Sequence, residues 1–230
     1  SRNKGAVIGF GIFLLVLLTA IFAPLIAPHD PNVPFDGMQR VPPVWSDKGN
    51  PMFLLGTDAV GRDMLSRLIY GTRFSLFIGL VVASLSTVLC VFVGALAAYA
   101  LTRLRMPLRN LILTLLLAVA MFPLISLMVP LFKLMREAGL LNTYPALVLP
   151  YAVLSLPVCT LVMASFFQDI PPDLEAAAMV DGCSRVGALF RVVIPLSAPG
   201  VFTAAILAFV NAWDEFLLAL TMMNRVNMRT

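Results

Sequence analysis

Long apolar stretches, separated by short polar or charged connections, dominate the pattern of this sequence. Five windows contain no Asp, Glu, Lys or Arg, and they are Ala6–Ala27, Phe74–Leu101, Asn110–Phe132, Ala138–Gln168 and Val192–Trp213. Each is long enough to cross a bilayer, which takes roughly 20 helical residues. Because apolar and polar residues do not alternate strictly in these windows, they suit helices rather than barrel strands. The pattern therefore predicts an all-α, polytopic transmembrane helical bundle with five spans.

The composition agrees with a membrane location. Of the 230 residues, 60% are hydrophobic and 12% are charged, and the mean hydropathy is +0.95. Soluble proteins have about 45–50% apolar and about 25% charged residues. A soluble fold of this length would leave too much apolar surface in water, so the composition excludes a soluble domain.

The ends of the chain lead to two further expectations. The first apolar window is longer than the roughly 7–15 apolar residues of a signal peptide, so we interpret it as an uncleaved span. The chain begins at Ser1 rather than Met and ends at Thr230 after an odd number of spans. We therefore expect a sixth span to be missing at the C-terminal end.

Basic residues predict the orientation of the spans. Lys and Arg gather in short cytoplasmic loops of membrane proteins. Two clusters obey this rule, one before the first span and one between the second and third spans, formed by Arg2 and Lys4 and by Arg103, Arg105 and Arg109. The N-terminus and the loop at 168–191 are then cytoplasmic, and the irregular loop at 28–73 is outside.

Several kinds of chemistry find no support in the sequence. Cys90, Cys159, Cys183 and the single His29 do not have the spacing of a metal site or a disulfide framework, so we expect no bound metal. No G-x-x-x-x-G-K motif is present, so this chain does not hold ATP through a P-loop of its own. The Arg residues are dispersed, which argues against nucleic acid. We expect no catalytic residues, no enzymatic activity and no cofactor bound by this chain.

The cytoplasmic segment at 168–200 predicts two short helices joined by a tight turn. Pro171 and Pro172 suit the first turn of a helix, where a missing N–H has little cost. Gly182 suits the position that ends this helix. Ser184 is suited to cap a second helix, Arg185–Val193, which Pro195 closes.

This segment resembles the cytoplasmic EAA loop of bacterial ABC-importer permeases, the binding-protein-dependent inner-membrane components. The motif residues are Glu175-Ala176-Ala177, Gly182 seven residues after the Glu, and Ile194-Pro195. We call residues 168–197 the EAA loop. The resemblance implies an ATPase-coupling role for Glu175, Ala176, Ala177, Asp181, Gly182, Ile194 and Pro195. The alternatives are an ordinary helical hairpin or a DNA-reading helix-turn-helix, although flanking spans would block access to a DNA groove.

Two parts of the chain resemble different branches of this family. Residues 1–73 contain Leu55-Gly56-Thr57-Asp58 and Gly61-Arg62-Asp63, and they resemble dipeptide, oligopeptide and nickel permeases. Residues 74–230 contain Phe209-Val210-Asn211-Ala212-Trp213-Asp214-Glu215, and they resemble maltose-type sugar permeases. We therefore expect a sugar or oligosaccharide as the substrate, with a peptide or nickel as the alternative.

The resemblance also implies the partners and the location of the protein. The partners are ABC ATPase subunits that hydrolyse ATP, a second permease subunit, either identical or different, an extracytoplasmic solute-binding protein, and membrane lipid. The location is the bacterial cytoplasmic (inner) membrane. A role in docking the binding protein is one interpretation of Arg62, Asp63 and Arg67 in the outer loop, and bridging to one another or to solvent is the other.

Four residues near the end of the last window are candidates for the substrate path: Asn211, Trp213, Asp214 and Glu215. Ionisable groups inside a span usually face a cavity or a path. An amide, an aromatic ring and carboxylates also suit a sugar. The alternative is that the span ends here, with the acids in headgroup water and Trp213 as an interfacial anchor. Two rival functions stay open: an ion-coupled secondary transporter that uses Asp214 and Glu215, and a structural membrane anchor.

Overall fold

The computed structural model describes residues 4–104 and 106–223. Arg2 and Arg105, which belong to the two predicted basic clusters, lie outside the described residues. The chain divides into two compact units, residues 1–79 and 80–229. The boundary that we expect at residue 74 separates the part that resembles peptide permeases from the part that resembles sugar permeases. It is not a boundary between compact units, and it stays a prediction.

Unit 1 begins with a helix that is almost entirely exposed. α1 (Lys4–Ile21) buries only Ala20, and the one-turn helix α2 (Ala23–Ile26) follows it. The connection from residue 27 to residue 63 is irregular, with an isolated bridge between Thr57 and Asp63. It leads into α3 (Met64–Arg103), whose 40 residues continue into unit 2.

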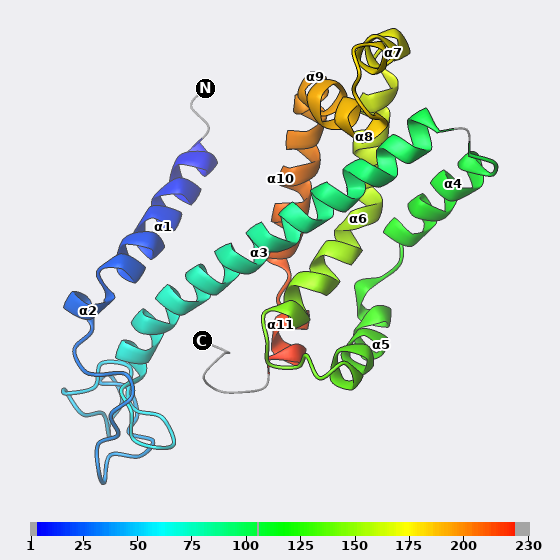
Figure 1. Ribbon diagram of the computed structural model, residues 1–230. Helices are drawn as coiled ribbons and strands as arrows, with labels where there is room; N and C mark the ends of the chain where they lie inside the picture. The colour runs from blue at the N-terminus through cyan, green and yellow to red at the C-terminus, as the bar shows by residue number, and fades with distance from the viewer. Residues whose placement is uncertain (1–3, 105, 224–230) are drawn as a thin grey trace. The chain divides into compact units, whose positions relative to one another are not determined.

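In unit 2, the remaining described elements are helical (Figure 1). They are α4 (Arg109–Ala120), α5 (Leu124–Glu137), α6 (Pro145–Gln168), α7 (Pro172–Val180), α8 (Arg185–Ala188), the π-helix η1 (Leu189–Val193), α9 (Ile194–Leu196), α10 (Ala198–Asp214) and α11 (Leu217–Met222). The elements α7, α8 and α9 lie at the end of the unit where α3 stops, and α5 and α11 lie at the opposite end (Figure 1). The described residues therefore form an all-α bundle, as the sequence predicts.

Three helices, α1, α3 and α6, are each long and apolar enough to cross a membrane. Two further spans result if each of two bent helix pairs counts as one, which gives the expected number of five. The pairs are α4 with α5, bent by 95°, and Arg185–Leu196 with α10, bent by 85°.

The window Asn110–Phe132 is therefore not a single straight helix. α4 ends at Ala120, and Pro123 is the N-cap of α5 with an extended backbone. Proline has no N–H to donate to the preceding turn, and it disfavours a helical conformation in the residue before it. The sharp bend at residues 121–123 follows from this proline.

Small residues bring α10 against α6. The buried residues of α10 are Gly200, Ala204, Ala208 and Ala212, one at every fourth position. This spacing keeps them on one face of the helix, and small side chains let membrane helices approach closely. At Gly200 the approach leaves no room for a side chain, because a Cβ there would lie 2.3 Å from Cγ of Phe166. Cys159, Met163 and other buried residues of α6 complete this core with parts of α3 and η1.

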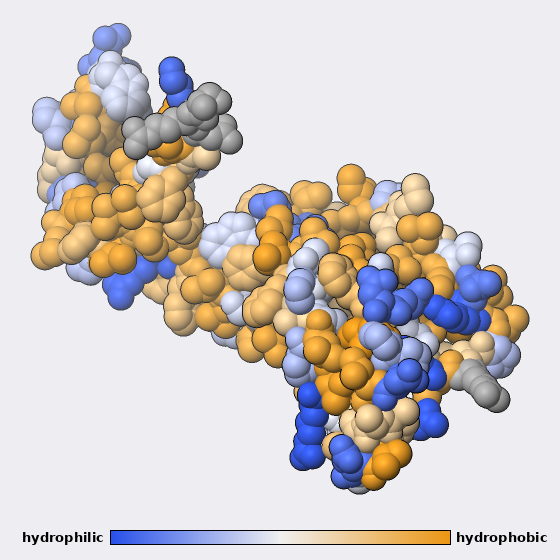
Figure 2. Space-filling view, turned by 90° about the horizontal axis from the view of Figure 1, so that it is seen from above, coloured by the Kyte–Doolittle hydropathy of each residue, from blue (hydrophilic) through white to orange (hydrophobic). Residues whose placement is uncertain are grey.

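Many large apolar side chains are exposed, as the orange areas in Figure 2 show. They occur along the membrane-length helices, for example at Phe10 in α1, Val88 in α3 and Val153 in α6. Such exposure is unfavourable in water and natural against lipid. The fold and the composition thus agree on a membrane environment.

We predict that Gly200→Ala destabilises unit 2 by about 1–3 kcal/mol, because the added methyl group overlaps the Phe166 ring. Gly71→Ala is the matched control. Gly71 lies inside α3 and a Cβ there meets nothing within 4 Å, so the same change removes backbone entropy and slightly stabilises the helix. Thermal unfolding in detergent measures both. Equal melting temperatures for the two variants would show that the contact of α10 with α6 is loose.

Candidate coupling site

The turn of the EAA loop has the geometry of a Schellman motif. After α7, the N–H of Gly182 donates to the carbonyl of Met179 at 3.1 Å, and the N–H of Cys183 donates to that of Ala178 at 3.0 Å. Gly182 has φ +88°, in the left-handed region that glycine adopts without a steric penalty. The prediction that Gly182 forms the turn between the two short helices is confirmed.

The second helix begins as predicted and ends later. The Ser184 hydroxyl accepts a hydrogen bond from the N–H of Gly187 at 3.1 Å, so Ser184 is the N-cap of α8. The helix does not close at Val193, because the chain widens into η1 and continues through Pro195 to Leu196. A wider π-turn accommodates a proline ring that would clash in a regular α-turn.

Glu175 of the motif points into the protein. Glu175 is 5% exposed, and its carboxylate accepts a hydrogen bond from the hydroxyl of Tyr99 in α3. Nε of Arg103, in the last turn of α3, lies 3.2 Å from Oε2 of Glu175 in an ion pair. Nη2 of the same arginine donates to the carbonyls of Phe167 at 2.9 Å and Ile170 at 2.7 Å. The buried carboxylate therefore has two partners on a neighbouring helix.

The other predicted coupling residues are more accessible. Ala176, Ala177, Asp181, Gly182 and Pro195 are exposed, and Ile194 is half-buried. Among the seven predicted coupling residues, five are therefore exposed, Ile194 is half-buried, and Glu175 is buried.

Large apolar side chains are also exposed on the EAA loop. Those in α7 and α8 lie on both sides of the Gly182 turn, and they are Leu174, Met179, Val180 and Val186, while Phe190 and Leu196 are exposed further along the loop. Val180 is 87% exposed, more than any other large apolar side chain among the described residues. We call these four residues the apolar face of the EAA loop.

Tyr99 and Arg103 were not among the predicted site residues. The sequence placed Tyr99 in an apolar window and Arg103 in a basic cluster, where both have ordinary explanations. A signal was present, because a buried Tyr hydroxyl needs a polar partner. The sequence could not supply the identity of that partner, which lies 76 positions away.

The predicted path residues differ in their contacts. Trp213 stacks on Phe209 with ring centroids 5.7 Å apart, and Asn211 and Asp214 are exposed. Glu215 instead lies in the break between α10 and α11. Its carboxylate accepts hydrogen bonds from the N–H of Leu217 at 2.9 Å and from the N–H of Leu218 at 2.9 Å.

Tyr151 of α6 adds a further contact to Glu215. Its hydroxyl donates to the carboxylate of Glu215 at 3.0 Å, and it also lies 3.1 Å from the backbone carbonyl of the same residue. Glu215, one residue before the N-cap Phe216, therefore holds the first turn of α11 and ties the helix break to α6. Tyr151, like Tyr99 and Arg103, was not among the predicted site residues, so it is the third such residue.

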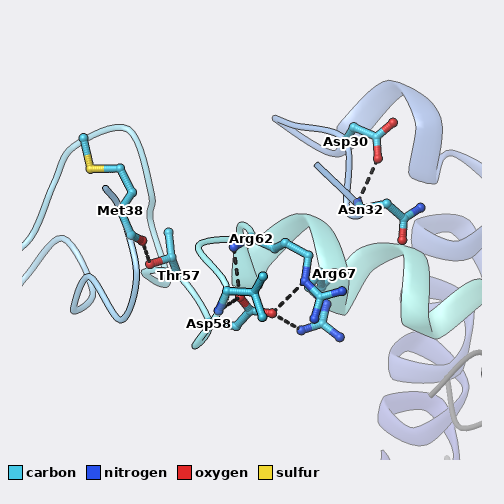
Figure 3. Close-up of polar contacts among 8 residues, drawn as sticks. Asp30, Asn32, Met38, Thr57, Asp58, Arg62 and Arg67 are labelled. Atoms are coloured by element: carbon cyan, nitrogen blue, oxygen red, sulfur yellow. Dashed lines mark hydrogen bonds and ion pairs between the residues drawn. The ribbon is translucent and has the colours of Figure 1, made fainter. Parts of the chain in front are cut away.

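In the outer loop of unit 1, Asp58 organises the basic residues (Figure 3). Nε of Arg62 lies 2.9 Å from Oδ2 of Asp58, and Nη1 of Arg67 pairs with the same oxygen. The predicted bridging of Arg62 and Arg67 is thus present, but its acid is Asp58 rather than Asp63. Burial opposes the charge of Asp58, yet hydrogen bonds from the backbone N–H groups of Arg62 and Val60 and the Arg62 side chain lower its pKa to about 2.

Asp63 has a different role, at the start of α3. Its carboxylate accepts from the N–H of Ser66 at 3.1 Å and lies 3.4 Å from Nδ1 of His29. The His29 ring is in turn in contact with Phe35 and with the fully buried Phe53. Asp63 therefore caps α3 and fixes the outer loop to it. In the described part of the chain, no group of three or more His, Cys, Asp or Glu side chains is arranged to hold a metal.

A helical bundle with membrane-length apolar helices and an exposed EAA loop at one end has the architecture of a multi-pass permease subunit. Comparison with known families supports this class. Residues 90–229 match the family described as binding-protein-dependent transport system inner membrane component, and residues 1–43 match the N-terminal TM domain of oligopeptide transport permease C. The chain belongs to the family of binding-protein-dependent transport system inner membrane components.

Individual relatives come from both branches that the sequence resembles. The sulfoquinovosyl glycerol transport system permease protein SmoH of Agrobacterium fabrum is 63% identical over 155 residues, which is 67% of this chain and 54% of the relative. The trehalose transport system permease protein SugB of Mycobacterium tuberculosis is 46% identical, over 64% of this chain and 53% of the relative. The di/tripeptide transport system permease protein DppC of Pseudomonas aeruginosa is 36% identical, over 92% of this chain and 67% of the relative.

The chain spans about half the length of the two sugar-type relatives. Among solved structures, a bacterial ABC transporter involved in the import of the acidic polysaccharide alginate has the same fold. The match has a TM-score of 0.61 and 21% identity, and it covers 100% of this chain and 78% of that chain. The protein is therefore a multi-pass component of an inner-membrane family.

We predict that the outer loop loses stability as the pH falls from about 4 towards 2. The pKa of Asp58 is about 2 in the folded protein, below its ordinary value of 3.8. The stabilising effect of the ionised carboxylate is therefore complete above pH 3.8 and disappears as the pH falls and the carboxylate protonates. Asp58→Asn should destabilise the loop at pH 7 by about 1–3 kcal/mol and weaken this pH dependence.

Hydrogen exchange of residues 28–63 measures this effect from about pH 6 down to about pH 2, after correction for the intrinsic exchange rate. Asp30→Asn is the control, because Asp30 accepts only a local hydrogen bond from Asn32 (Figure 3). If both variants exchanged alike at every pH, the two arginine pairs would not hold the loop.

Proposed function

We propose that this chain is a transmembrane permease subunit of an ATP-driven solute importer. It forms the translocation path together with a second permease subunit, and it couples to a separate ATPase through the EAA loop. The observation that carries this proposal is the form of that loop. It is a short helix–Gly–helix element, anchored to α6 at one end and α10 at the other, with exposed apolar side chains on both sides of its turn.

The apolar face of the EAA loop is suited to docking a protein. Val180 and Val186 lie on opposite sides of the Gly182 turn, and both are exposed. At the aqueous end of a span, exposed apolar area costs roughly 25 cal/mol per Å², so a partner that covers it gains this free energy. The exposed Asp173, Asp181 and Arg185 would form a polar rim around this face.

The charge distribution supports an EAA loop in the cytoplasm. Arg103 and the EAA loop meet at one end of unit 2, since Arg103 contacts Glu175 and the end of α6. Arg109 starts α4 only six positions after Arg103. By the positive-inside rule this end faces the cytoplasm. Two spans, α1 and α3, separate the N-terminus from Arg103, so the N-terminus with Lys4 is then cytoplasmic as well.

In this scheme the chain performs no covalent chemistry. ATP is bound and hydrolysed by the partner ATPase, and the permease itself needs no cofactor. Closure of the ATPase pair would move the two EAA loops as rigid bodies and switch the path between its inward-facing and outward-facing forms. An extracytoplasmic binding protein would deliver the solute.

We infer that the substrate is a sugar or an oligosaccharide. The two relatives SmoH and SugB, at 63% and 46% identity, are named for a sulfoquinovosyl glycerol and for trehalose, and each match covers about two thirds of this chain. Trp213, with Asn211 and Asp214 nearby, offers an aromatic ring and polar groups to such a solute. Glu215 contributes by fixing the helix break beside them rather than by binding the solute itself.

A peptide or nickel substrate is the second candidate. It is favoured by the match of residues 1–43 to the oligopeptide permease domain and by the relationship to DppC over most of this chain. Under this alternative the outer loop, held by Asp58, would contact a peptide-binding or nickel-binding protein.

We predict that Val180→Asp and Val186→Asp each reduce association with the ATPase about tenfold or more, because a charge replaces an apolar contact at a protein interface. Val33→Asp, at an exposed apolar position of the outer loop, is the matched control. The measurement is the ATPase retained by the purified permease after co-expression with the ATPase and binding-protein genes of its own operon. Normal retention by both EAA-loop variants would refute docking through this face.

We also predict that Trp213→Ala raises the KM of sugar uptake at least about tenfold, since aromatic residues often dominate binding sites. Phe10→Ala, an exposed aromatic residue of α1, should leave KM unchanged. Uptake into cells or proteoliposomes with labelled trehalose, maltose, dipeptides and nickel gives both the substrate class and the effect. Uptake of dipeptides or nickel without sugar would replace the first candidate with the second.

A further inference from the structure

Arg103 joins three helices at the point where the EAA loop leaves the bundle. Its own helix is α3, it binds carbonyls at the C-terminal end of α6, and it pairs with Glu175 in the first turn of α7. Tyr99, one turn earlier in α3, donates a hydrogen bond to the same carboxylate. We call Tyr99, Arg103 and Glu175 the α3 latch.

The sequence at the α6–α7 junction creates the site that Arg103 fills. In a continuing α-helix the carbonyl of Phe167 would accept from the N–H of residue 171, but Pro171 has none. The carbonyls of Phe167 and Ile170 thus lie at a helix end, where the dipole is negative and a cation is favourable. One guanidinium offers several donors in a fixed fork, so it can serve both carbonyls while its Nε faces Glu175.

Burial makes this arrangement sensitive to the loss of any member. Glu175 is 5% exposed, and the side chain of Arg103 is 9% exposed. Removing one partner leaves the other charge buried without compensation, which is far more costly than losing a surface pair. A carboxylate that is engaged in this way is turned away from a docking partner, in contrast to the exposed Val180.

We propose that Arg103 and Tyr99 are positioning residues of the coupling site, and that Glu175 acts inside the permease, as the attachment of α7 to α3 and α6, rather than as a ligand of the ATPase. This inference rests on the proposed coupling function. Two sets of residues then have different roles. The apolar face of the EAA loop binds the ATPase, and the α3 latch transmits the displacement of α7 to the membrane-spanning helices α3 and α6.

The test separates attachment of α7 from attachment of the ATPase. Hydrogen exchange of residues 172–180 in the full chain, in nanodiscs without ATPase, reports the α3 latch alone. We expect Glu175→Gln and Arg103→Met each to speed this exchange by about tenfold or more, and the double variant to cost less than the sum of the two, because the buried pair is removed together. Asp173→Asn, an exposed acid in the same turn of α7, is the matched control for loss of a charge near the helix N-terminus, and it should speed the exchange much less.

The second readout is coupling in the assembled complex. The latch variants should keep most of the ATPase that co-purifies with the unaltered permease, yet hydrolyse ATP with uptake reduced about tenfold or more. Tyr99→Phe removes one hydroxyl with little change in shape, so it should give an intermediate loss even if stronger variants fold poorly. Arg103→Lys keeps the charge without the fork, and it should also be intermediate.

Two results would overturn the proposal. One is unchanged exchange of α7 in all the latch variants, and the other is complete loss of the ATPase by Glu175→Gln with α7 still protected, which would make Glu175 a direct ligand of the partner. Failure of the proposed function itself has a different signature. In that case Val180→Asp and Val186→Asp have no effect on ATPase retention, while exchange of α7 still responds to Arg103.

Discussion

Wherever a helix stops inside a poorly hydrated bundle, the backbone groups that it releases need new hydrogen-bond partners. This requirement organises both candidate sites of unit 2. At the end of α6, Arg103 serves the carbonyls of Phe167 and Ile170. At the start of α11, the carboxylate of Glu215 serves the N–H groups of Leu217 and Leu218. In each case a charged side chain makes the break in the helix stable, and the break then gives the site its shape.

The packing of α10 on α6 provides the frame for the EAA loop. α6 leads into the loop and α10 leaves it, so the distance between the two helices fixes both ends of the loop. The small residues from Gly200 to Ala212 allow that distance to be short. A loop whose ends are held this closely can move only together with the helices that hold it. This mechanical property is what a coupling function would need, and it depends on residues that are not in the motif itself.

The candidate sites differ in how far the sequence alone could describe them. The Gly182 turn and the Ser184 cap are local, since their partners lie within five positions along the chain, and both were predicted. The bridging in the outer loop was predicted with the wrong acid, because Asp58 and Asp63 are both near Arg62 and Arg67 in the sequence and only the fold separates their roles. Tyr99, Arg103 and Tyr151 were missed as site residues, because their partners lie more than 60 positions away.

The sequence by itself determined the membrane environment, the helical class and the position of the EAA loop, because these follow from composition, from the length of the apolar windows and from local turn chemistry. It could also locate the prolines, although it did not show that Pro123 bends one window by 95° while Pro150 and Pro157 stay inside a continuous α6. Only the tertiary structure decided which way each functional side chain faces. Glu175 is buried because α3 brings an arginine and a tyrosine to its side of α7, whereas Val180 of the same helix is exposed. That difference arises from contacts between distant segments, which local pattern cannot encode.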